Sequence, residues 1–432
     1  MKKYGIACIC MIFICAGLGA EHIVYSANGS YRLVERTDLR RYENGRYAGL
    51  TSREVRSFIA ADANAGDYVG ADSPYMRDTW YDGNFYVNEG TKRAALHTTP
   101  NIHTAIPSIF HISSDGRMTM YQDNGYPSFR SFPMYPNTSF SVGEKWQAQG
   151  ERAVDPMYKG LPTRMPMYVE YTFIGKELYN DEPVYRLTAE WATRYDIYHA
   201  DPNGDPDLKS ATGSHKAFIL VSCNTGAAVL VKDQVDETFV YANGKDVQLK
   251  GTITLFTEVS EPLERSKLIP ALNRIATVKA SDADNDFVRA AKEKLTDNGA
   301  ADSGGDAPTN NIVVEETNSG LRLSVRDVRF LPDSPQVLPG ESERLDEIAS
   351  VLRLAPDTQF LVEGHTALAG KPREEQSLSE ERARAIAQEL VSRGIPAEQF
   401  ICKGLGSSIP VADNFTEEGR SQNRRVEITI LE

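Results

Sequence analysis

The sequence has no long hydrophobic run beyond its first twenty residues. Nowhere in residues 21–432 do about 18 apolar residues follow one another, which is the length that a membrane-spanning helix needs. Hydrophobic residues make up 41% of the chain and charged residues 25%, as in a globular protein. A chain of 432 residues is too long for one small core, so we expect several domains.

The chain also has fewer basic than acidic residues, and it lacks the common catalytic motifs. Asp and Glu outnumber Lys and Arg by 60 to 47, which gives a net charge of -13 and makes a nucleic-acid partner improbable. The sequence contains no G-x-S-x-G or H-E-x-x-H motif, no glycine-rich phosphate loop and no Cys–His pairing. We therefore expect a protein that is not an enzyme and needs no small-molecule cofactor.

Residues 1–20, MKKYGIACICMIFICAGLGA, have the layout of an export signal peptide. Lys2 and Lys3 precede an apolar stretch, and small residues follow it, so cleavage is expected near Gly19 or Ala20. Lipid attachment at Cys15 is the alternative, but Ile14 stands where a lipoprotein peptidase prefers a small residue.

Cysteine is scarce once this signal has been removed. Only Cys223 and Cys402 remain, in segments that we assign to different domains. An oxidising compartment permits a disulfide, yet two separate buried thiols fit this placement better.

Aromatic residues divide the chain into two parts. All three Trp residues, and every Tyr except Tyr4, lie between Tyr25 and Tyr241. β-Branched and aromatic runs in this part are separated by turn dipeptides such as Asp115-Gly116 and Asn243-Gly244. We predict an antiparallel β-rich region, sandwich or barrel-like, with a β-rich domain at 21–145 and an antiparallel β domain at 146–265. Whether these are one domain or two stays open.

An outer-membrane β-barrel is a weaker alternative for this region. Tyr residues would suit the aromatic girdles of such a barrel, but runs such as YVEYTFIGKE and LVKDQVDETF place charges on both strand faces. Residues 266–311 are predicted to form a helical connector and a flexible linker. Leu268, Leu272 and Ile275, and later Phe287, Ala291 and Leu295, have helical spacing, whereas 296–311 carry no apolar residue larger than Ala or Pro.

Residues 312–432 alternate strands and helices, which predicts a two-layer α/β sandwich within a multidomain α+β protein. The expected strands are 312–317, 321–330, 358–365, 400–406 and 424–432, the first two forming a hairpin that turns at Gly320. Helices are expected at 341–355 and 377–394. In the second helix Ser377 and Glu380 are spaced as a capping box, and Gly394 is the stop.

Several short motifs occur in this segment in a fixed order. They are Phe330, Gly364-His365-Thr366, Leu378-Ser379-x-x-Arg382-Ala383, Gly404, Gly406, Asn414, Gly419-Arg420 and Asn423-Arg424-Arg425-Val426-Glu427. With these motifs, residues 312–432 resemble the OmpA-like domain of outer-membrane proteins, peptidoglycan-associated lipoproteins and flagellar stator proteins. The resemblance does not extend to residues 21–300.

The resemblance implies a ligand, the diaminopimelate side chain of a peptidoglycan stem peptide, which is bound without chemistry. It implies a pocket of Thr366, Ala367, Glu375, Arg382 and Arg424, supported by the motif residues Gly364, His365, Leu378, Ser379, Ala383, Asn414, Gly419, Arg420 and Asn423. Arg382 would pair with the ligand carboxylate, and the family's Asp after Gly-His-Thr would take the ammonium. Here that position holds Ala367, and Glu375 replaces the usual Asn.

Losing one partner of such a charge pair typically costs about 2 to 5 kcal/mol, so conventional diaminopimelate binding should be weak or absent. Glu374 or Glu375 could replace the missing carboxylate, or the ligand could be an ornithine- or lysine-type stem peptide. We expect an exported periplasmic protein that tethers or organises the cell envelope through peptidoglycan, with outer-membrane association left open. The alternative is a scaffold that binds only other envelope proteins.

Two metal-site candidates are not favoured. Asp201, Asn203, Asp205 and Asp207 alternate as in a calcium loop, but Pro206 and Thr212 stand where Gly and Glu are needed. The spacing of His97, His103 and His111 matches no common ligand pattern, so we expect no metal there.

Overall fold

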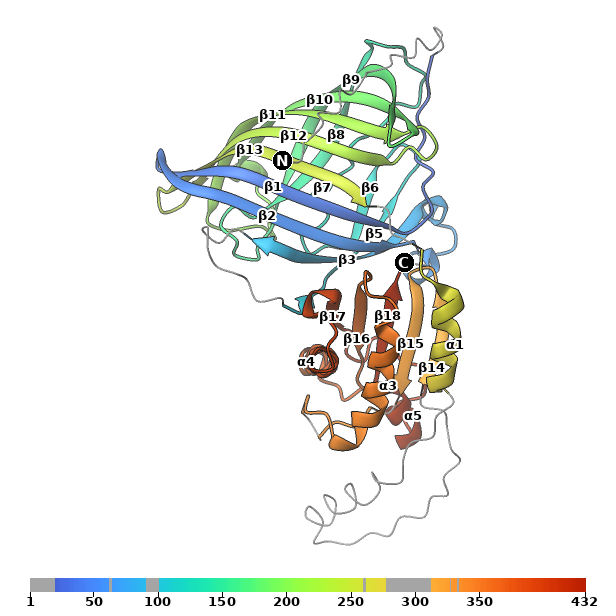
Figure 1. The fold of residues 1–432 in the computed structure, drawn as a ribbon. Coiled ribbons are helices and arrows are strands. Elements are labelled where there is room, and N and C mark those ends of the chain that lie inside the picture. Colours follow the sequence, from blue (N-terminus) through green and yellow to red (C-terminus); the bar gives the residue numbers. More distant parts are fainter. Residues whose placement is uncertain are drawn as a thin grey trace, which may run out of the picture. The chain divides into compact units, whose positions relative to one another are not determined.

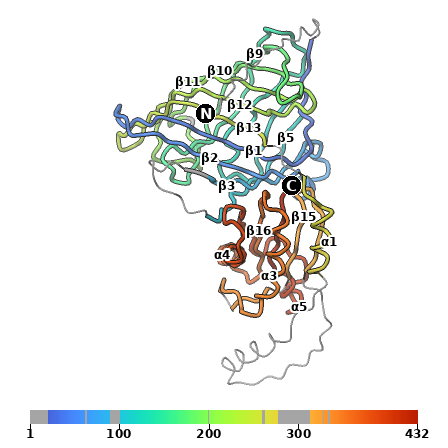
Figure 2. The backbone as a smooth tube through the Cα atoms, viewed as in Figure 1, coloured from blue at the N-terminus to red at the C-terminus, as the bar shows by residue number. Residues whose placement is uncertain are grey.

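The computed structural model describes residues 20–61, 64–90, 101–258, 262–276, 312–326, 328–331 and 334–432. These residues form two compact units (Figures 1 and 2). The N-terminal unit contains the described residues up to 90 and from 107 to 258, and the C-terminal unit contains the described residues of 101–106 and 262–432. Within the described residues, no helix is both long enough and apolar enough to cross a membrane.

The N-terminal unit is built on one twelve-stranded sheet. Its strands are β1 (Tyr31–Glu43), β2 (Arg46–Ala60), β3 (Thr79–Gly90), β5 (Ile106–Ile112), β6 (Met118–Gln122), β7 (Phe129–Arg130), β8 (Lys145–Val154), β9 (Thr163–Tyr179), β10 (Glu182–Asp196), β11 (Leu208–Ser222), β12 (Ala228–Tyr241) and β13 (Asp246–Glu258). Their order is β6-β5-β3-β2-β1-β13-β12-β11-β10-β9-β8-β7. The sheet curls strongly in Figure 1.

Neighbouring strands of this sheet are antiparallel, which confirms the predicted antiparallel, barrel-like architecture. Gly116 and Gly244, at predicted hairpin turns, have φ angles of 83° and 79°, values that favour glycine. β1 and β13 pair along their length from Arg32 opposite Glu258. The strands of 21–145 and those of 146–258 therefore belong to one sheet.

The two faces of this sheet differ. Alternate residues such as Val169, Leu187 and Ile219 are fully buried in one core, together with Trp191 and Phe239. The other face carries cross-strand ion pairs, among them Lys145–Glu170, Lys216–Glu190 and Lys250–Asp236.

The C-terminal unit contains a six-stranded mixed sheet. Its strands are β4 (His103–Thr104), β14 (Ile312–Thr317), β15 (Gly320–Arg326), β16 (Phe360–Gly364), β17 (Phe400–Gly404) and β18 (Arg425–Leu431), in the order β14-β15-β18-β16-β17-β4. β16 and β17 are parallel, and β18 is antiparallel to β16. The predicted strands of 312–432 are thus present, and Gly320 closes the first hairpin with a φ angle of 134°.

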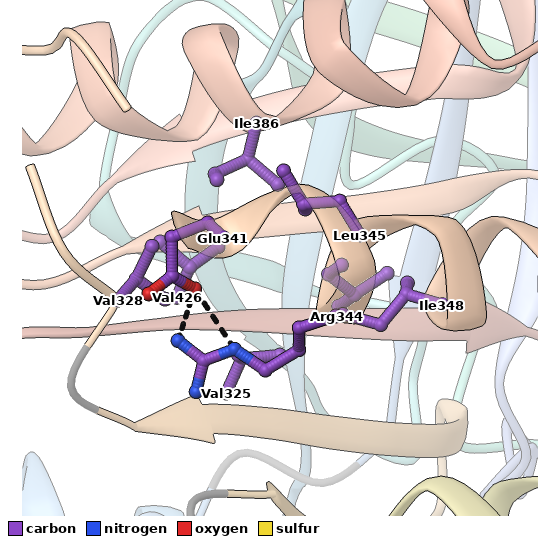
Figure 3. A pocket seen from close by; sticks show the side chains of 9 residues that line it. Val325, Val328, Glu341, Arg344, Leu345, Ile348, Ile386 and Val426 are labelled. Carbon is purple, nitrogen blue, oxygen red and sulfur yellow. Dashed lines mark hydrogen bonds and ion pairs between the residues drawn. The ribbon is translucent and has the colours of Figure 1, made fainter. Parts of the chain in front are cut away.

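Among the described residues of this unit, the helices are α1 (Arg265–Ala276), α3 (Ser342–Leu352), α4 (Pro372–Ser392) and the short α5 (Glu417–Asn423). Leu268 of α1, Ile348 of α3 and Ile386 of α4 join Phe360 and Ile428 of the sheet in one buried core, which confirms the α/β sandwich. The core holds a small cavity beside the Glu341–Arg344 ion pair (Figure 3). It has room for about one water molecule.

The predicted start of the helix at Ser377 is wrong. α4 begins five residues earlier, at Pro372. Proline is favourable in the first turn of a helix because the N–H that it lacks would have no acceptor within the helix there. The Ser377 hydroxyl donates a hydrogen bond to Glu381 inside the helix, so Ser377 and Glu380 form no capping box. Glu375 instead accepts a hydrogen bond from the backbone N–H of Lys371, the N-cap residue. The end is as predicted, because Gly394 follows the helix with a φ angle of 90°.

Some sequence predictions lie outside the described residues. They are the signal sequence up to Gly19, the second connector helix around Phe287 and the linker at 296–311. The free thiols Cys223 and Cys402 belong to different units.

Candidate functional site

The candidate site lies where β16 ends and the loop 365–370 begins. The α-carbon of Gly364 packs against α4 so closely that a Cβ there would stand 2.0 Å from the Ser379 carbonyl oxygen. Gly404, at the end of β17, approaches the same turn of α4, where a Cβ would stand 2.7 Å from the Ser379 hydroxyl. Both motif glycines therefore let the helix sit directly on the strand ends.

Hydrogen bonds to two other segments fix the loop at Thr366 and Leu368. The Thr366 N–H donates to the Gly406 carbonyl at 2.8 Å, and the Leu368 N–H donates to Asn414 Oδ1 at 3.0 Å. Ala367 lies between these two anchored positions and is half-buried. The Asn423 amide holds the neighbouring loop, because its Oδ1 accepts hydrogen bonds from the N–H groups of Val411 and Ala412.

Glu375 is turned toward the backbone of the same loop. Its Oε1 accepts hydrogen bonds from the N–H groups of Ala369 and Lys371, at 2.8 and 2.9 Å, and its Oε2 accepts one from the Ser407 hydroxyl. Burial favours the neutral acid, but these bonds outweigh it and lower the pKa of Glu375. Glu374 is exposed and pairs with Lys371. Both carboxylates are therefore engaged locally.

Arg382 lies on the turn of α4 that packs against the end of β16, since it is flanked by Ser379 and Ala383. It is 8% exposed. Its guanidinium stacks over the Phe330 ring at 4.8 Å, and its Nε donates to the Ser334 carbonyl at 3.2 Å. Stacking holds the planar guanidinium in a fixed orientation, as recognition of a carboxylate requires.

The second basic group belongs to α5. Arg420 and Arg424 both pair with Glu417, and Arg424 is about one-third exposed. Thr416 caps this helix by accepting a hydrogen bond from the Gly419 N–H. A Cβ at Gly419 would stand 1.8 Å from the Asp413 carbonyl oxygen, so this motif glycine is needed for the turn. The arginines thus form a charged edge around α5.

Behind the loop, His365 is buried among charged residues. Its Nε2 lies 3.8 Å from Glu427, which pairs with Arg425 at 2.7 Å. In the described parts of the chain, neither ring nitrogen of His365 has a hydrogen-bond partner. Burial and the Arg425 cation lower the pKa of His365 from 6.5 to about 4, so the ring is neutral at pH 7.

The structure thus brings Thr366, Ala367, Glu375 and Asn414 into one hydrogen-bonded loop system beside the helix turn of Arg382. It places Arg424 against Glu417 instead. Leu378 is partly buried on α4. Sequence reasoning missed four exposed apolar residues in the two loops that the Leu368–Asn414 bond joins, namely Leu368, Ile409, Val411 and Phe415. These residues are scattered through irregular loops, which carry no periodic signal.

A buried polar cluster inside the N-terminal sheet was also missed. The His215 ring contacts Asp233 through Nδ1 at 2.6 Å and Glu237 through Nε2 at 3.0 Å. Glu237 accepts further hydrogen bonds from Arg152 and Thr193, both at 2.6 Å. The alternation of residues along a strand could have revealed this cluster, because Asp233 and Glu237 occupy inward positions of β12.

Most of the residues considered as metal ligands form ion pairs with other side chains where the structure describes them. Asp201 pairs with Arg164, and Asp205 and Asp207 pair with Lys159. His111 pairs with Asp78, and His97 lies outside the described residues. Among the described residues, no three His, Cys, Asp or Glu side chains are grouped to hold a metal ion.

Comparison with known proteins assigns the C-terminal segment. Residues 329–424 match the OmpA family. The chain is 37% identical over 103 residues to the peptidoglycan-binding protein ArfA of Mycobacterium tuberculosis, covering 24% of this chain and 32% of ArfA. It is 37% identical over 169 residues to outer membrane porin F of Pseudomonas aeruginosa, covering 38% of this chain and 45% of the porin.

A solved outer membrane protein of Borrelia burgdorferi is 38% identical, with 28% of this chain and 97% of that chain covered and a TM-score of 0.24. The matches to ArfA and to porin F each cover less than half of the relative's own length.

Proposed function

Because residues 329–424 form an OmpA family domain, we propose that this protein is a non-catalytic envelope protein that contacts peptidoglycan through that domain. The observation that carries the proposal is the placement of Arg382. It is buried and stacked on Phe330, on the helix turn that packs against the Gly-His-Thr segment. A stem peptide offers a carboxylate, with which a fixed guanidinium forms paired, charge-assisted hydrogen bonds.

The ammonium side of the same ligand has no acidic partner at position 367. Glu375 cannot supply one without giving up three hydrogen bonds that hold the loop, and Glu374 is paired with Lys371. We therefore propose that the domain holds the carboxylate end of the stem peptide and binds diaminopimelate weakly. An ornithine- or lysine-type stem peptide would meet the same deficit.

The placement proposed for the protein follows from this contact. Export through residues 1–20 would bring the domain to the cell wall in the periplasm. The charged outer face of the N-terminal sheet is compatible with that aqueous compartment. The protein would then link the wall to whatever the N-terminal unit binds.

A second candidate function is a scaffold that binds only envelope proteins. One observation favours it: Leu368, Ile409, Val411 and Phe415 are between 46% and 92% exposed, around the loop that carries Ala367. Apolar residues grouped at a surface are typical of protein contacts.

Co-sedimentation with purified cell-wall sacculi tests the proposal. The full-length mature chain should pellet with sacculi, and Arg382→Ala and Arg382→Lys should both remain in the supernatant, because lysine keeps the charge but loses the planar fork. Arg373→Ala, which removes an exposed arginine of the same helix, is the matched control. Equal pelleting of the Arg382 variants and the control would refute the role of Arg382, and failure of the unmodified chain to pellet would favour the scaffold.

A further inference from the structure

We propose that the outer edge of β17 is a docking site for one extended segment, and that each molecule fills this site with its own residues 102–105. β4 lies parallel to β17, with His103 opposite Ile401 and Thr104 opposite Cys402. The Ala105 N–H donates to the Cys402 carbonyl at 2.9 Å. Without this segment β17 would be the last strand of the sheet (Figure 1).

Side chains as well as backbone recognise the segment. Arg384 of α4 donates to the Ile102 carbonyl at 3.4 Å and to the Thr104 hydroxyl. Ile102 packs against the hydrophobic core of the C-terminal unit, and Ala105 is buried. Ile102 and Thr104 are two residues apart, so both side chains lie on the face of the strand that meets α4. The site therefore selects an extended peptide with an apolar residue, a hydroxyl two positions later and a small residue after that.

Two consequences follow from the position of this segment in the chain. An unpaired strand edge is a template for pairing with other chains, and residues 102–105 cover it. The segment also belongs to the C-terminal unit, whereas the described residues before 90 and after 107 belong to the N-terminal unit. The chain thus contributes to the C-terminal unit twice, first with residues 102–105 and again from residue 262 onward.

Hydrogen exchange of single amides in the full-length chain tests this inference. In a strand the N–H and C=O of one residue point to the same side, so the Cys402 N–H faces β4 as its carbonyl does. Ala105→Pro removes the donor to Cys402, and we expect the exchange of the Cys402 amide to accelerate by about tenfold or more, as when one or two hydrogen bonds are lost. The Val362 amide in β16, which has a strand on either side, should stay protected and reports that the domain remains folded.

Arg384→Ala provides a second variant that leaves the backbone of the segment unchanged, and Arg373→Ala is its control. Faster exchange at Cys402 with Arg384→Ala but not with the control is expected. Unchanged protection at Cys402 in both Ala105→Pro and Arg384→Ala would overturn the inference. Protection that disappears on dilution of the unmodified chain would also overturn it, because the segment would then come from a second copy.

Discussion

The Glu375 carboxylate accepts a hydrogen bond from the backbone N–H of Ala369 at 2.8 Å. This bond joins the start of α4 to the loop that carries Ala367. The same carboxylate also accepts hydrogen bonds from the Lys371 N–H and from the hydroxyl of Ser407, so it ties the end of this loop to the segment that follows β17. Glu375 therefore supports the backbone around Ala367, which explains how a glutamate is accommodated where the family usually has Asn.

Replacing Glu375 by Ala should destabilise the C-terminal unit. The change leaves two backbone N–H groups and a hydroxyl without their acceptor in a buried position, which should lower the free energy of unfolding by about 2 to 4 kcal/mol. Urea unfolding of the two chains measures the difference. Glu374→Ala removes an exposed carboxylate from the neighbouring position and should change stability by no more than about 0.5 kcal/mol. Equal effects of the two substitutions would contradict the anchoring role.

The neutral, buried His365 should make the C-terminal unit sensitive to acid. Its pKa is about 4 in the folded chain and about 6.5 when unfolded, so the unfolded state binds the extra proton first as the pH falls. Stability should therefore be lost between pH 6.5 and 4, by up to about 3 kcal/mol from this residue. His365→Gln cannot be protonated, and its unfolding free energy should fall less over this range. If the unfolding free energies of the unmodified chain and of His365→Gln changed equally with pH, His365 would not be the group responsible.

The His215 cluster should have the opposite pH dependence. Burial opposes the charged ring, but the hydrogen bonds to Asp233 and Glu237 outweigh it and raise the pKa of His215. A raised folded pKa means that the stabilisation is fully present below pH 6.5 and is lost as the pH rises through the folded value. Urea unfolding followed by tryptophan fluorescence should detect this, because the Trp191 ring stacks on His215 at 4.4 Å.

His215→Gln should remove this pH dependence and destabilise the N-terminal unit by about 3 to 5 kcal/mol at pH 6, because the buried Asp233 carboxylate loses its charged partner, whereas Glu237 keeps Arg152 and Thr193. His22→Gln, at an exposed histidine of the same unit, is the control. If His215→Gln retained the loss of stability at alkaline pH, another group would have to be responsible.

The sequence predicted the C-terminal elements well because their signals are local. The spacing of Leu345, Ile348 and Leu352 defines a helix face, and Val426, Ile428 and Ile430 alternate as in a strand; all six are buried as expected. The start of α4 was predicted wrongly because the spacing of Ser377 and Glu380 is that of a capping box. The side chain that accepts a hydrogen bond from the N-cap N–H is Glu375, and this bond to a backbone group has no sequence signature.

Pairings between distant segments could not be predicted in the same way. Nothing near Arg32 or Glu258 indicates that these residues lie opposite each other, since the pairing depends on the whole sheet between them. His103 and Thr104 form too short a strand to show a pattern, and no local rule states which sheet an edge strand joins. For the candidate site, the family motifs name the positions, and the structure shows that one of them, Arg424, pairs with Glu417.

Calorimetric titration of the full-length mature chain with a diaminopimelate-containing stem peptide tests whether Ala367 weakens binding. We expect weak binding by the unmodified chain and binding at least about tenfold tighter by Ala367→Asp, the lower limit for restoring one member of a partly buried charge pair. Ala367→Asn introduces a side chain of nearly the same shape as aspartate but without its charge, so it should not tighten binding. Tight binding by the unmodified chain, with no gain from Ala367→Asp, would show that Ala367 does not weaken the site.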